Sequence, residues 1–349
     1  MSALAAAGVA VWLLVEARAP APPRLLVGVD DDRLKWTPNP LDIVAAEREL
    51  GADAVRVWVS WYGETKPGPV RSTELDRAEQ AASRIRVVLA VFGFARVTPR
   101  TPAARRRFCA YAGAALARVP EARAVVVWNE ANSPVYWNAG AAAYESLLAR
   151  CYDVLHRVRP SVVVLDSTAS AHDPAAFLRA LGAAYRASGR TRPLVDAFGH
   201  NPYPESAREP VSARHRGGFL GEGDYPRLAA TLDAAFAGTA QRSRAVWYLE
   251  DGFQTAVPRR LAGLYRGRET VATDPPAVQA ERVKEAIRLA ACQPTVRAIF
   301  NFELVDETRL AGWQSGLEWR GQHPKPAATA FSSAARAAAR GDVRCGTGP

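Results

Sequence analysis

The strongest constraint on the fold of this chain is an alternation of eight short apolar segments with eight longer amphipathic ones. The short segments are nearly continuous in Val, Ile, Leu and aromatic residues, which is typical of strands buried on both faces of a parallel sheet. The longer segments are rich in alanine, and several begin with a proline, which favours the first turn of a helix. The predicted strands are 24–29, 54–59, 85–91, 124–128, 162–165, 195–199, 245–249 and 296–302. The predicted helices are 41–50, 72–83, 102–117, 140–157, 174–187, 225–237, 276–291 and 324–340.

This alternation predicts an α/β fold, a (β/α)8 TIM barrel in which residues 24–349 form a single domain. A doubly wound open sheet is the alternative, and it usually carries a glycine-rich phosphate-binding turn after its first strand. The turn here instead contains Asp30, Asp31 and Asp32, which would repel phosphate and which we expect to be solvated. Long segments follow the last three predicted strands and would lie at the C-terminal face, where barrels build active sites. These segments are 201–224, 251–274 and 303–323.

The first residues of the chain differ from the rest in composition. Residues 4–15 are entirely apolar or small, Ala17-Arg18-Ala19 resembles a cleavage site, and the segment 20–23 is rich in proline. This pattern predicts that residues 1–23 form a secretory signal, or an N-terminal membrane anchor with a Pro-rich spacer. The apolar run is shorter than the about 20 residues that a spanning helix needs, and no basic residue precedes it. A frayed helix or a different start codon therefore stays an alternative to the secreted or cell-surface protein that we expect.

The four cysteines are compatible with an exported protein. Cys109 and Cys151 lie on successive predicted helices, which should be neighbours, while Cys292 ends the next-to-last helix and Cys345 lies in the C-terminal tail. We expect disulfides Cys109–Cys151 and Cys292–Cys345, because oxidised pairs are typical of secreted chains. Four cysteines allow three pairings, and four buried free thiols are an equally open alternative.

The charge pattern excludes some partners. The net charge of +10 comes almost wholly from arginine, and no basic run is interleaved with aromatic residues. We therefore expect no nucleic-acid partner. Four of the histidines, at positions His156, His172, His215 and His323, are scattered without the spacing of metal ligands. We expect a monomer without metal or cofactor.

Polar residues that suit sugar chemistry follow three of the predicted strands. Asn129 and Glu130 end the fourth strand, His200 and Tyr203 follow the sixth, and Glu250 ends the seventh. Cleavage of a glycosidic bond with retention needs two carboxyl groups about 5–5.5 Å apart, one as proton donor and one as nucleophile. Residues that end the fourth and seventh strands can face each other across a barrel mouth.

In this pattern the sequence resembles glycoside hydrolase clan A, and especially its families 39 and 5, over residues 24–340. The matching elements are Arg56 on the second strand, Trp128-Asn129-Glu130 on the fourth, His200 and Tyr203 on the sixth, Glu250 and Gly252 on the seventh, and the run Trp313-Gln314-Ser315-Gly316-Leu317 after the eighth. The resemblance implies a retaining hydrolase of an oligo- or polysaccharide, with Glu130 as acid/base and Glu250 as nucleophile.

Each matching residue has an expected physical role. Asn129 would bind the sugar 2-hydroxyl, Tyr203 and Arg56 would hold Glu250 ionised, and an apolar setting would keep Glu130 protonated. His200 is the remaining substrate-binding candidate. The tryptophans near strand ends are candidate platforms for sugar rings. They are Trp58, Trp61, Trp137 and Trp313.

Several alternatives stay open at this point. Arg56 could form a purely structural ion pair, His200 could be a histidine whose hydrogen bonds are satisfied within the protein, and each tryptophan could pack in the core. Leu249 precedes Glu250 where clan members commonly have a small polar residue, so the substrate is undetermined. At the level of function, an inactive barrel that binds a cell-surface polysaccharide is the second hypothesis. A lyase or aldolase is the third, and it would need a lysine or a metal cluster at the strand ends.

Overall fold

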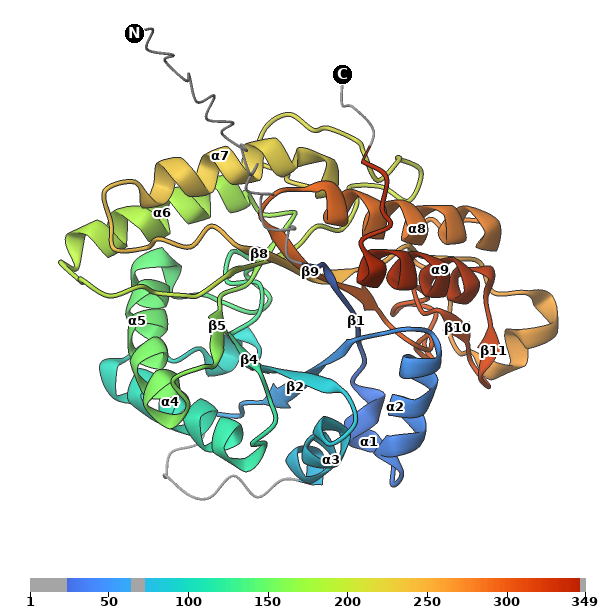
Figure 1. The fold of residues 1–349 in the computed structure, drawn as a ribbon, viewed down its shortest axis with the longest axis horizontal. Helices are drawn as coiled ribbons and strands as arrows, with labels where there is room; N and C mark the ends of the chain where they lie inside the picture. Colours follow the sequence, from blue (N-terminus) through green and yellow to red (C-terminus); the bar gives the residue numbers. More distant parts are fainter. Residues whose placement is uncertain (1–23, 64–72, 346–349) are drawn as a thin grey trace, which may run out of the picture.

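A computed structural model of the chain describes residues 24–63 and 73–345 (Figure 1). The predicted signal or membrane anchor in residues 1–23 lies outside the described residues. Within the described part of the chain, no helix has the length and apolar composition needed to cross a membrane.

The described residues form one nine-stranded parallel sheet, in the order β5-β4-β3-β2-β1-β9-β8-β7-β6. Helices surround the strands in Figure 1, which gives the molecule a barrel-like α/β architecture. Each of the eight predicted strands is present. The bounds are β1 (Leu26–Asp30), β2 (Ala54–Ser60), β3 (Arg86–Phe92), β4 (Ala124–Val127), β5 (Val163–Leu165), β6 (Thr168–Ala169), β7 (Phe198–Asn201), β8 (Val246–Asp251) and β9 (Val296–Phe302).

The additional strand, β6, arises where the chain departs from regular pairing just after β5. β5 pairs with β4 and β6 pairs with β7, although only Asp166 and Ser167 separate the two strands in the sequence. The Asp166 carboxylate accepts the backbone N–H of Gly199 at 2.9 Å, so a side chain makes a bond between neighbouring strands there. Leu165 in addition bridges to Ala197, just before β7. The two ends of the sheet are therefore consecutive in the chain.

The helices lie close to their predicted positions. Six of those in the described residues have a proline at their first turn, where its missing N–H costs no hydrogen bond. The last helix begins at Pro326 rather than at residue 324, because His323–Pro324 (β11) pairs with Glu318–Trp319 (β10). The bounds are α1 (Arg33–Trp36), α2 (Pro40–Glu49), α3 (Thr73–Ala82), α4 (Pro102–Arg118), α5 (Gly140–Val158), α6 (Pro174–Ala187), α7 (Tyr225–Phe236), α8 (Pro276–Cys292) and α9 (Pro326–Arg340).

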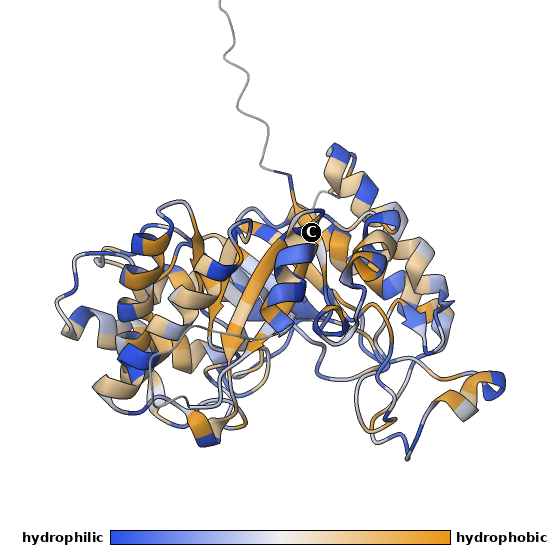
Figure 2. Cartoon of the chain, turned by 90° about the horizontal axis from the view of Figure 1, so that it is seen from below, coloured by the Kyte–Doolittle hydropathy of each residue, from blue (hydrophilic) through white to orange (hydrophobic). Residues whose placement is uncertain are grey.

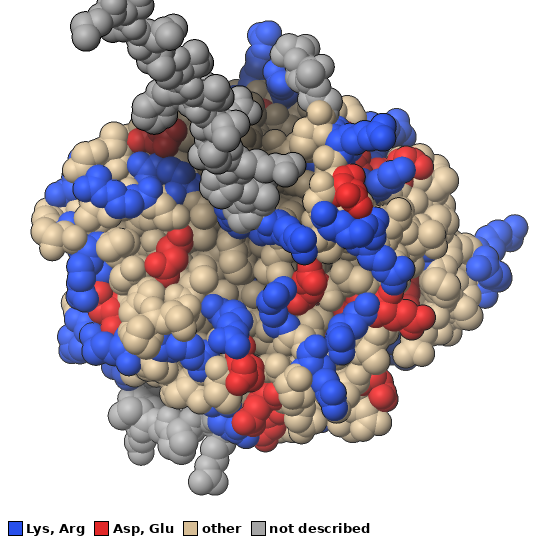
Figure 3. Space-filling view, in the orientation of Figure 1, with Lys and Arg blue, Asp and Glu red and all other residues tan. Residues whose placement is uncertain are grey.

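The apolar core lies between the sheet and the inner faces of the helices. The strands are buried along almost their whole length, and Figure 2 shows hydrophobic colour concentrated in them while hydrophilic residues occupy the outer helix faces. Burial of this apolar surface is the main favourable term in folding. On the face shown in Figure 3, Lys and Arg side chains are spread among Asp and Glu rather than gathered in one patch.

Both predicted disulfides are confirmed. Cys109–Cys151 joins α4 to the neighbouring α5, and Cys292–Cys345 joins the end of α8 to the C-terminal tail. Disulfides form and persist in oxidising compartments, so the pairs point to a location outside the cytosol.

Candidate active site

A cavity of about 630 Å³ opens at the C-terminal ends of the strands. It lies where parallel α/β barrels place their active sites. Its wall includes residues from the ends of β1, β2, β3, β4, β8 and β9 and from the segments that follow them. The predicted site residues that line it are Arg56, Trp58, Asn129, Glu130, Glu250 and Trp313.

Glu250 lies near the end of β8, and both of its carboxylate oxygens accept hydrogen bonds. Arg56 donates to Oε1 at 2.8 Å, and the hydroxyl of Tyr203 donates to Oε2 at 3.2 Å. Hydrogen bonds that a guanidinium donates to a carboxylate are among the strongest in proteins. The sequence-predicted partners of Glu250 are therefore both in contact with it.

Arg56 connects three strands at the floor of the cavity. Besides Glu250 on β8, its guanidinium donates to the Asp30 carboxylate on β1 and to Asn129 Oδ1 beyond β4, the latter at 3.0 Å. Arg56 is buried, and its charge is matched by the two carboxylates. A planar guanidinium suits this role because its several donors have fixed directions.

Glu130 has a different environment from Glu250. Its carboxyl accepts one hydrogen bond, from Asn201 Nδ2 at 2.9 Å. Burial, followed by the nearby charge of Glu250, raises the pKa of Glu130 to about 7, while Asn201 and Arg56 act in the opposite direction. A carboxyl that holds its proton near neutral pH can serve as a general acid.

The backbone around Glu130 is held in an unusual conformation. Trp128 and Glu130 have φ values of 72° and 40°, in the left-handed region that residues other than glycine seldom adopt. Several bonds fix it: Trp128 Nε1 donates to the carbonyl of Tyr136 at 3.0 Å, and Glu130 N donates to Ser167 Oγ at 3.2 Å. Such conformations cost roughly 1–3 kcal/mol each and persist where the surroundings enforce them. The segment after β5 therefore helps to aim Glu130.

The aspartates after β1 do not form the solvated turn that the sequence suggests. Asp30 and Asp31 are buried. Asp30 faces Arg56, and burial raises its pKa although the arginine opposes this. Asp31 pairs with Arg33, and Asp32 accepts the backbone N–H of Trp58 at 2.9 Å. The prediction of a solvated turn is wrong because these carboxylates have internal partners.

Aromatic side chains line part of the cavity. Trp58 stacks on Phe92 with ring centroids 4.6 Å apart, and its Nε1 donates to the Phe92 carbonyl at 3.1 Å. Trp313, in the segment after β9, stacks on Tyr203 with ring centroids 4.9 Å apart. Trp313 thus packs on the residue that donates to Glu250, so that Tyr203 links the Trp313 ring to the Glu250 carboxylate.

Two predicted site residues lie away from the cavity wall. His200 is buried on β7, where Nε2 lies 2.8 Å from the carbonyl oxygen of Leu220 and Nδ1 lies 3.0 Å from the Thr168 hydroxyl. Burial lowers its pKa to about 4, so the ring is neutral near pH 7. Trp137 is buried and donates to the carbonyl of Gly140 at 2.9 Å. The structure does not bring these two side chains to the other site residues; Trp61 is likewise in the core.

Other residues complete the site without having been predicted. Asn201 bonds Glu130, and Tyr136 lines the cavity, where burial and the charges of Glu250 and Glu130 raise its pKa. A signal for Asn201 exists in the sequence, because neighbouring strand residues point to opposite faces. Since His200 points out of the cavity, Asn201 beside it points in. No comparable pattern marks Tyr136, which lies in a loop.

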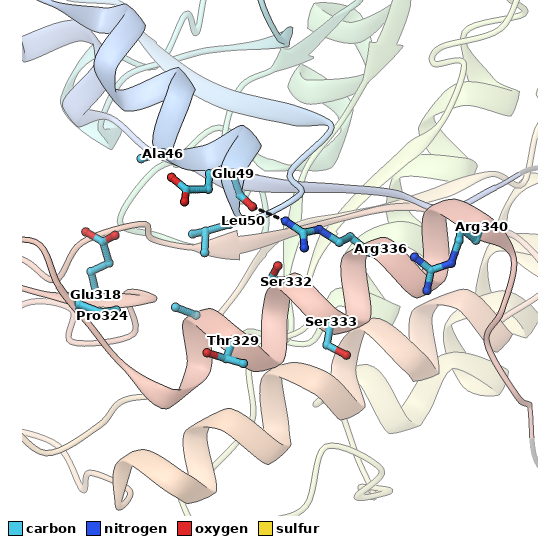
Figure 4. Close-up of a pocket in the computed structure, with 11 residues that line it drawn as sticks. Ala46, Glu49, Leu50, Glu318, Pro324, Thr329, Ser332, Ser333, Arg336 and Arg340 are labelled. Atoms are coloured by element: carbon cyan, nitrogen blue, oxygen red, sulfur yellow. Dashed lines mark hydrogen bonds between the residues drawn. The ribbon is translucent and has the colours of Figure 1, made fainter.

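A second cavity, of about 720 Å³, lies between α2 and α9. Figure 4 shows small and polar side chains from both helices around it, with Arg336 donating to the carbonyl of Glu49 at 2.6 Å. None of the predicted site residues is among those that line it. The cavity at the strand ends is therefore the candidate active site, despite its smaller volume.

The Tyr203 hydroxyl should matter for turnover. Tyr203→Phe removes one donor to Glu250, and a hydrogen bond to a charged group contributes about 1.5–3 kcal/mol. We expect kcat/KM for the reaction at this site to fall roughly 10- to 150-fold on this basis. Tyr152→Phe is the matched control, because Tyr152 donates to Asp196 at the same distance, 3.2 Å, far from the cavity. Equal losses in the two variants would contradict a role for Tyr203 at Glu250.

Fold and site together define a barrel-like α/β protein with two dissimilar glutamates, one beyond β4 and one on β8, in a cavity at the strand ends. No protein-family model matches the sequence, and no curated protein matches it either.

Several solved structures with a similar fold are glycoside hydrolases. A family 39 glycoside hydrolase from the gut symbiont Bacteroides cellulosilyticus WH2 matches over 89% of this chain and 64% of its own, with a TM-score of 0.64 and 16% identity. A GH5_18 protein from Streptomyces cattleya in complex with GlcNAc matches over 94% and 82%, with a TM-score of 0.64 and 17% identity. An exo-β-1,4-mannosidase from Opitutaceae bacterium strain TAV5 matches over 91% and 60%, with a TM-score of 0.60 and 14% identity.

The chain thus has the fold of glycosidases from families 39 and 5, which confirms the resemblance at that level. It spans less than two thirds of the length of the family 39 structure.

Proposed function

We propose that the protein is a retaining glycoside hydrolase that cleaves O-glycosidic bonds in an oligo- or polysaccharide. The observation that carries the proposal is that two carboxyl groups in one cavity have different surroundings. Glu250 accepts bonds from Arg56 and Tyr203, as suits an ionised nucleophile. Glu130 has a pKa raised to about 7, as suits a proton donor. Carboxyl pairs whose environments separate their protonation states are the signature of acid and base roles.

The proposed reaction has two displacements. In the first, Glu130 protonates the glycosidic oxygen while Glu250 attacks the anomeric carbon, so that a covalent glycosyl-enzyme forms and the leaving alcohol departs. In the second, Glu130 takes a proton from water, which attacks the same carbon and releases Glu250. Asn129 is positioned by its bond to Arg56, and we assign it to the sugar 2-hydroxyl.

The architecture proposed for this enzyme is an eightfold barrel. In that interpretation β5 and β6 are one strand, interrupted at Asp166 and Ser167, which pairs with β4 on one side and β7 on the other. The disulfides support a secreted or cell-surface protein, and we propose that it acts as a monomer.

The substrate class follows in part from the cavity walls. Trp58 and Trp313 offer ring surfaces of the kind that pack on sugar faces, and two of the similar structures are described with GlcNAc and with Manβ1-4GlcNAc. A panel of glycans that includes β-mannosides and GlcNAc-containing oligosaccharides should therefore reveal a cleaved substrate by the appearance of new reducing ends. ¹H NMR of the first product then tests the mechanism, because retention requires the anomeric configuration of the substrate. An initially inverted anomer, or no product from the panel, would contradict the proposal.

The pH profile should report the proton on Glu130. The acid form is required, and its pKa is raised to about 7, so kcat/KM should be sustained below that pH. Above it, the rate should fall about tenfold per pH unit as Glu130 loses its proton, since kcat/KM follows the ionisation of the free enzyme.

A variant can test whether Glu130 causes the alkaline limb of the pH profile, that is, the fall in kcat/KM at high pH. The bond from Asn201 favours the ionised form of Glu130 and lowers its pKa, so Asn201→Ala should move the limb to higher pH. An unchanged limb in that variant, with the protein folded, would mean that another group controls it.

A further inference from the structure

A second set of chemically competent side chains lies outside the cavity, on the segment between β7 and α7. It comprises Glu205, Glu209 and His215, whose potential ligand atoms all lie within 4.8 Å of one another. His215 Nε2 lies 3.2 Å from a Glu209 oxygen and 3.9 Å from a Glu205 oxygen. In the sequence His215 is a scattered histidine, because only the fold of this segment brings the three residues together.

The imidazole of His215 is oriented by a fourth residue. The Asp224 carboxylate lies 2.7 Å from Nδ1 and also accepts the backbone N–H groups of His215 and Gly221, at 2.9 and 3.0 Å. Asp224 is buried and therefore fixed. A carboxylate that accepts a hydrogen bond from Nδ1–H favours the tautomer with a free lone pair on Nε2, and metal-binding histidines are commonly held in this way.

We propose that Glu205, Glu209 and His215 bind a divalent transition-metal ion, with Zn²⁺ as the best fit. Zinc accepts imidazole nitrogen and carboxylate oxygen at about 2.0–2.2 Å in a tetrahedron, whose ligands are then about 3.4 Å apart. The separations of 3.2 and 3.9 Å around Nε2 are close to that edge. Three protein ligands leave the fourth position to water.

The charge balance and the setting of the site agree with a cation. Three carboxylates surround the imidazole of His215. Asp224 also pairs with Arg227, at 3.2 Å, whereas Glu205 and Glu209 both face Nε2. A divalent ion would neutralise Glu205 and Glu209. It would also connect two parts of the segment, since Glu205 is 10 residues before His215. Tyr203, which bonds Glu250, is two residues before Glu205, so the ion would also steady the segment that carries this hydroxyl.

Without metal, the same geometry describes a protonated His215 paired with acidic neighbours, and binding of Zn²⁺ distinguishes the two. The full chain, freed of metal by a chelator, is titrated with ZnCl₂ in an isothermal calorimeter near pH 7.5, and the bound ion is counted by native mass spectrometry. We expect one Zn²⁺ per chain, and a rise in melting temperature with Zn²⁺ that MgCl₂ does not reproduce, because the site offers a nitrogen ligand.

Variants tie the binding to these side chains. Glu205→Gln keeps an exposed side chain of the same size but removes a charged ligand, so the affinity should fall at least tenfold; His215→Gln should abolish binding. The matched control is Glu281→Gln, an exposed glutamate on α8, which should leave the affinity unchanged. Absence of saturable Zn²⁺ binding by the parent chain, or equal affinity in parent and Glu205→Gln, would overturn the proposal. Because no glycan is needed, the outcome is independent of the proposed hydrolase activity.

Discussion

Glu250→Ala should reduce turnover by at least about 10⁴-fold, or about 5.5 kcal/mol at 1.36 kcal/mol per tenfold. In the proposed reaction this carboxylate forms the covalent bond to the sugar, and no neighbour can replace it. Azide should restore part of the rate, because a small anion can enter the space left by the carboxylate and attack the anomeric carbon. The product would then be a glycosyl azide of inverted configuration. Initial rates and NMR of the azide adduct measure both effects.

A surface glutamate provides the control for this loss. Glu281→Ala removes a carboxylate from the exposed face of α8 and should leave the rate within about twofold of the parent, as surface substitutions usually do. A folded Glu250→Ala protein that kept full activity would exclude Glu250 as nucleophile.

The loss of rate in Glu130→Ala should depend on the leaving group of the substrate. In a natural linkage the leaving group is a sugar alkoxide, which needs a proton to depart. General acids contribute about 10²–10⁴-fold, so the rate of cleavage of natural linkages should fall by that factor. A 2,4-dinitrophenyl glycoside releases 2,4-dinitrophenolate, which departs without a proton. The first displacement on this substrate should therefore proceed at nearly the parent rate. Pre-steady-state release of dinitrophenol measures that step alone.

The second displacement provides an internal check on Glu130. Without a base to activate water, the glycosyl-enzyme should accumulate and be detected by mass spectrometry as a covalent adduct on Glu250. Azide should release it as a glycosyl azide of retained configuration. If the loss were the same for both kinds of leaving group, Glu130 would not be the acid.

Most of the fold could be predicted because the strands are almost continuously apolar and alternate regularly with helices. The eight predicted strands correspond to β1–β5 and β7–β9, and α6 (Pro174–Ala187) agrees residue for residue. The missed elements depend on contacts between distant residues. β6 is two residues long and pairs with β7, next to the point where the Asp166 carboxylate accepts the backbone N–H of Gly199. The late start of α9 likewise follows from pairing of β10 with β11.

The site could be predicted to the level of which strand each residue follows, but not always to the direction of its side chain. Arg56 and Trp58 are two apart on β2 and both line the cavity, as strand alternation requires. His200 and Asn201 are adjacent on β7, and the one that bonds Glu130 is Asn201. The bonds of His200 to Leu220 and Thr168 involve a long segment and β6, neither of which has a regular pattern in the sequence.

The burial of the aspartates after β1 is harder still to foresee. Three consecutive acidic residues normally favour water. Here Asp30 pairs with Arg56 and Asp31 with Arg33, while the half-buried Asp32 pairs with Lys35 and accepts the backbone N–H of Trp58.

The nearness of Glu250 to Glu130 has a further consequence for the order of events. After burial, the charge of Glu250 is the largest cause of the raised pKa of Glu130. When Glu250 becomes an ester in the proposed intermediate, that charge disappears and the pKa of Glu130 must fall. Glu130 has by then given its proton to the departing alcohol, and the lower pKa keeps it ionised while water binds. Hydrolysis of the ester restores the charge, and Glu130 regains its affinity for a proton. The repulsion between the two carboxylates is unfavourable in the resting protein. It would nevertheless keep Glu130 protonated for the first displacement, and its loss in the intermediate would keep Glu130 ionised for the second.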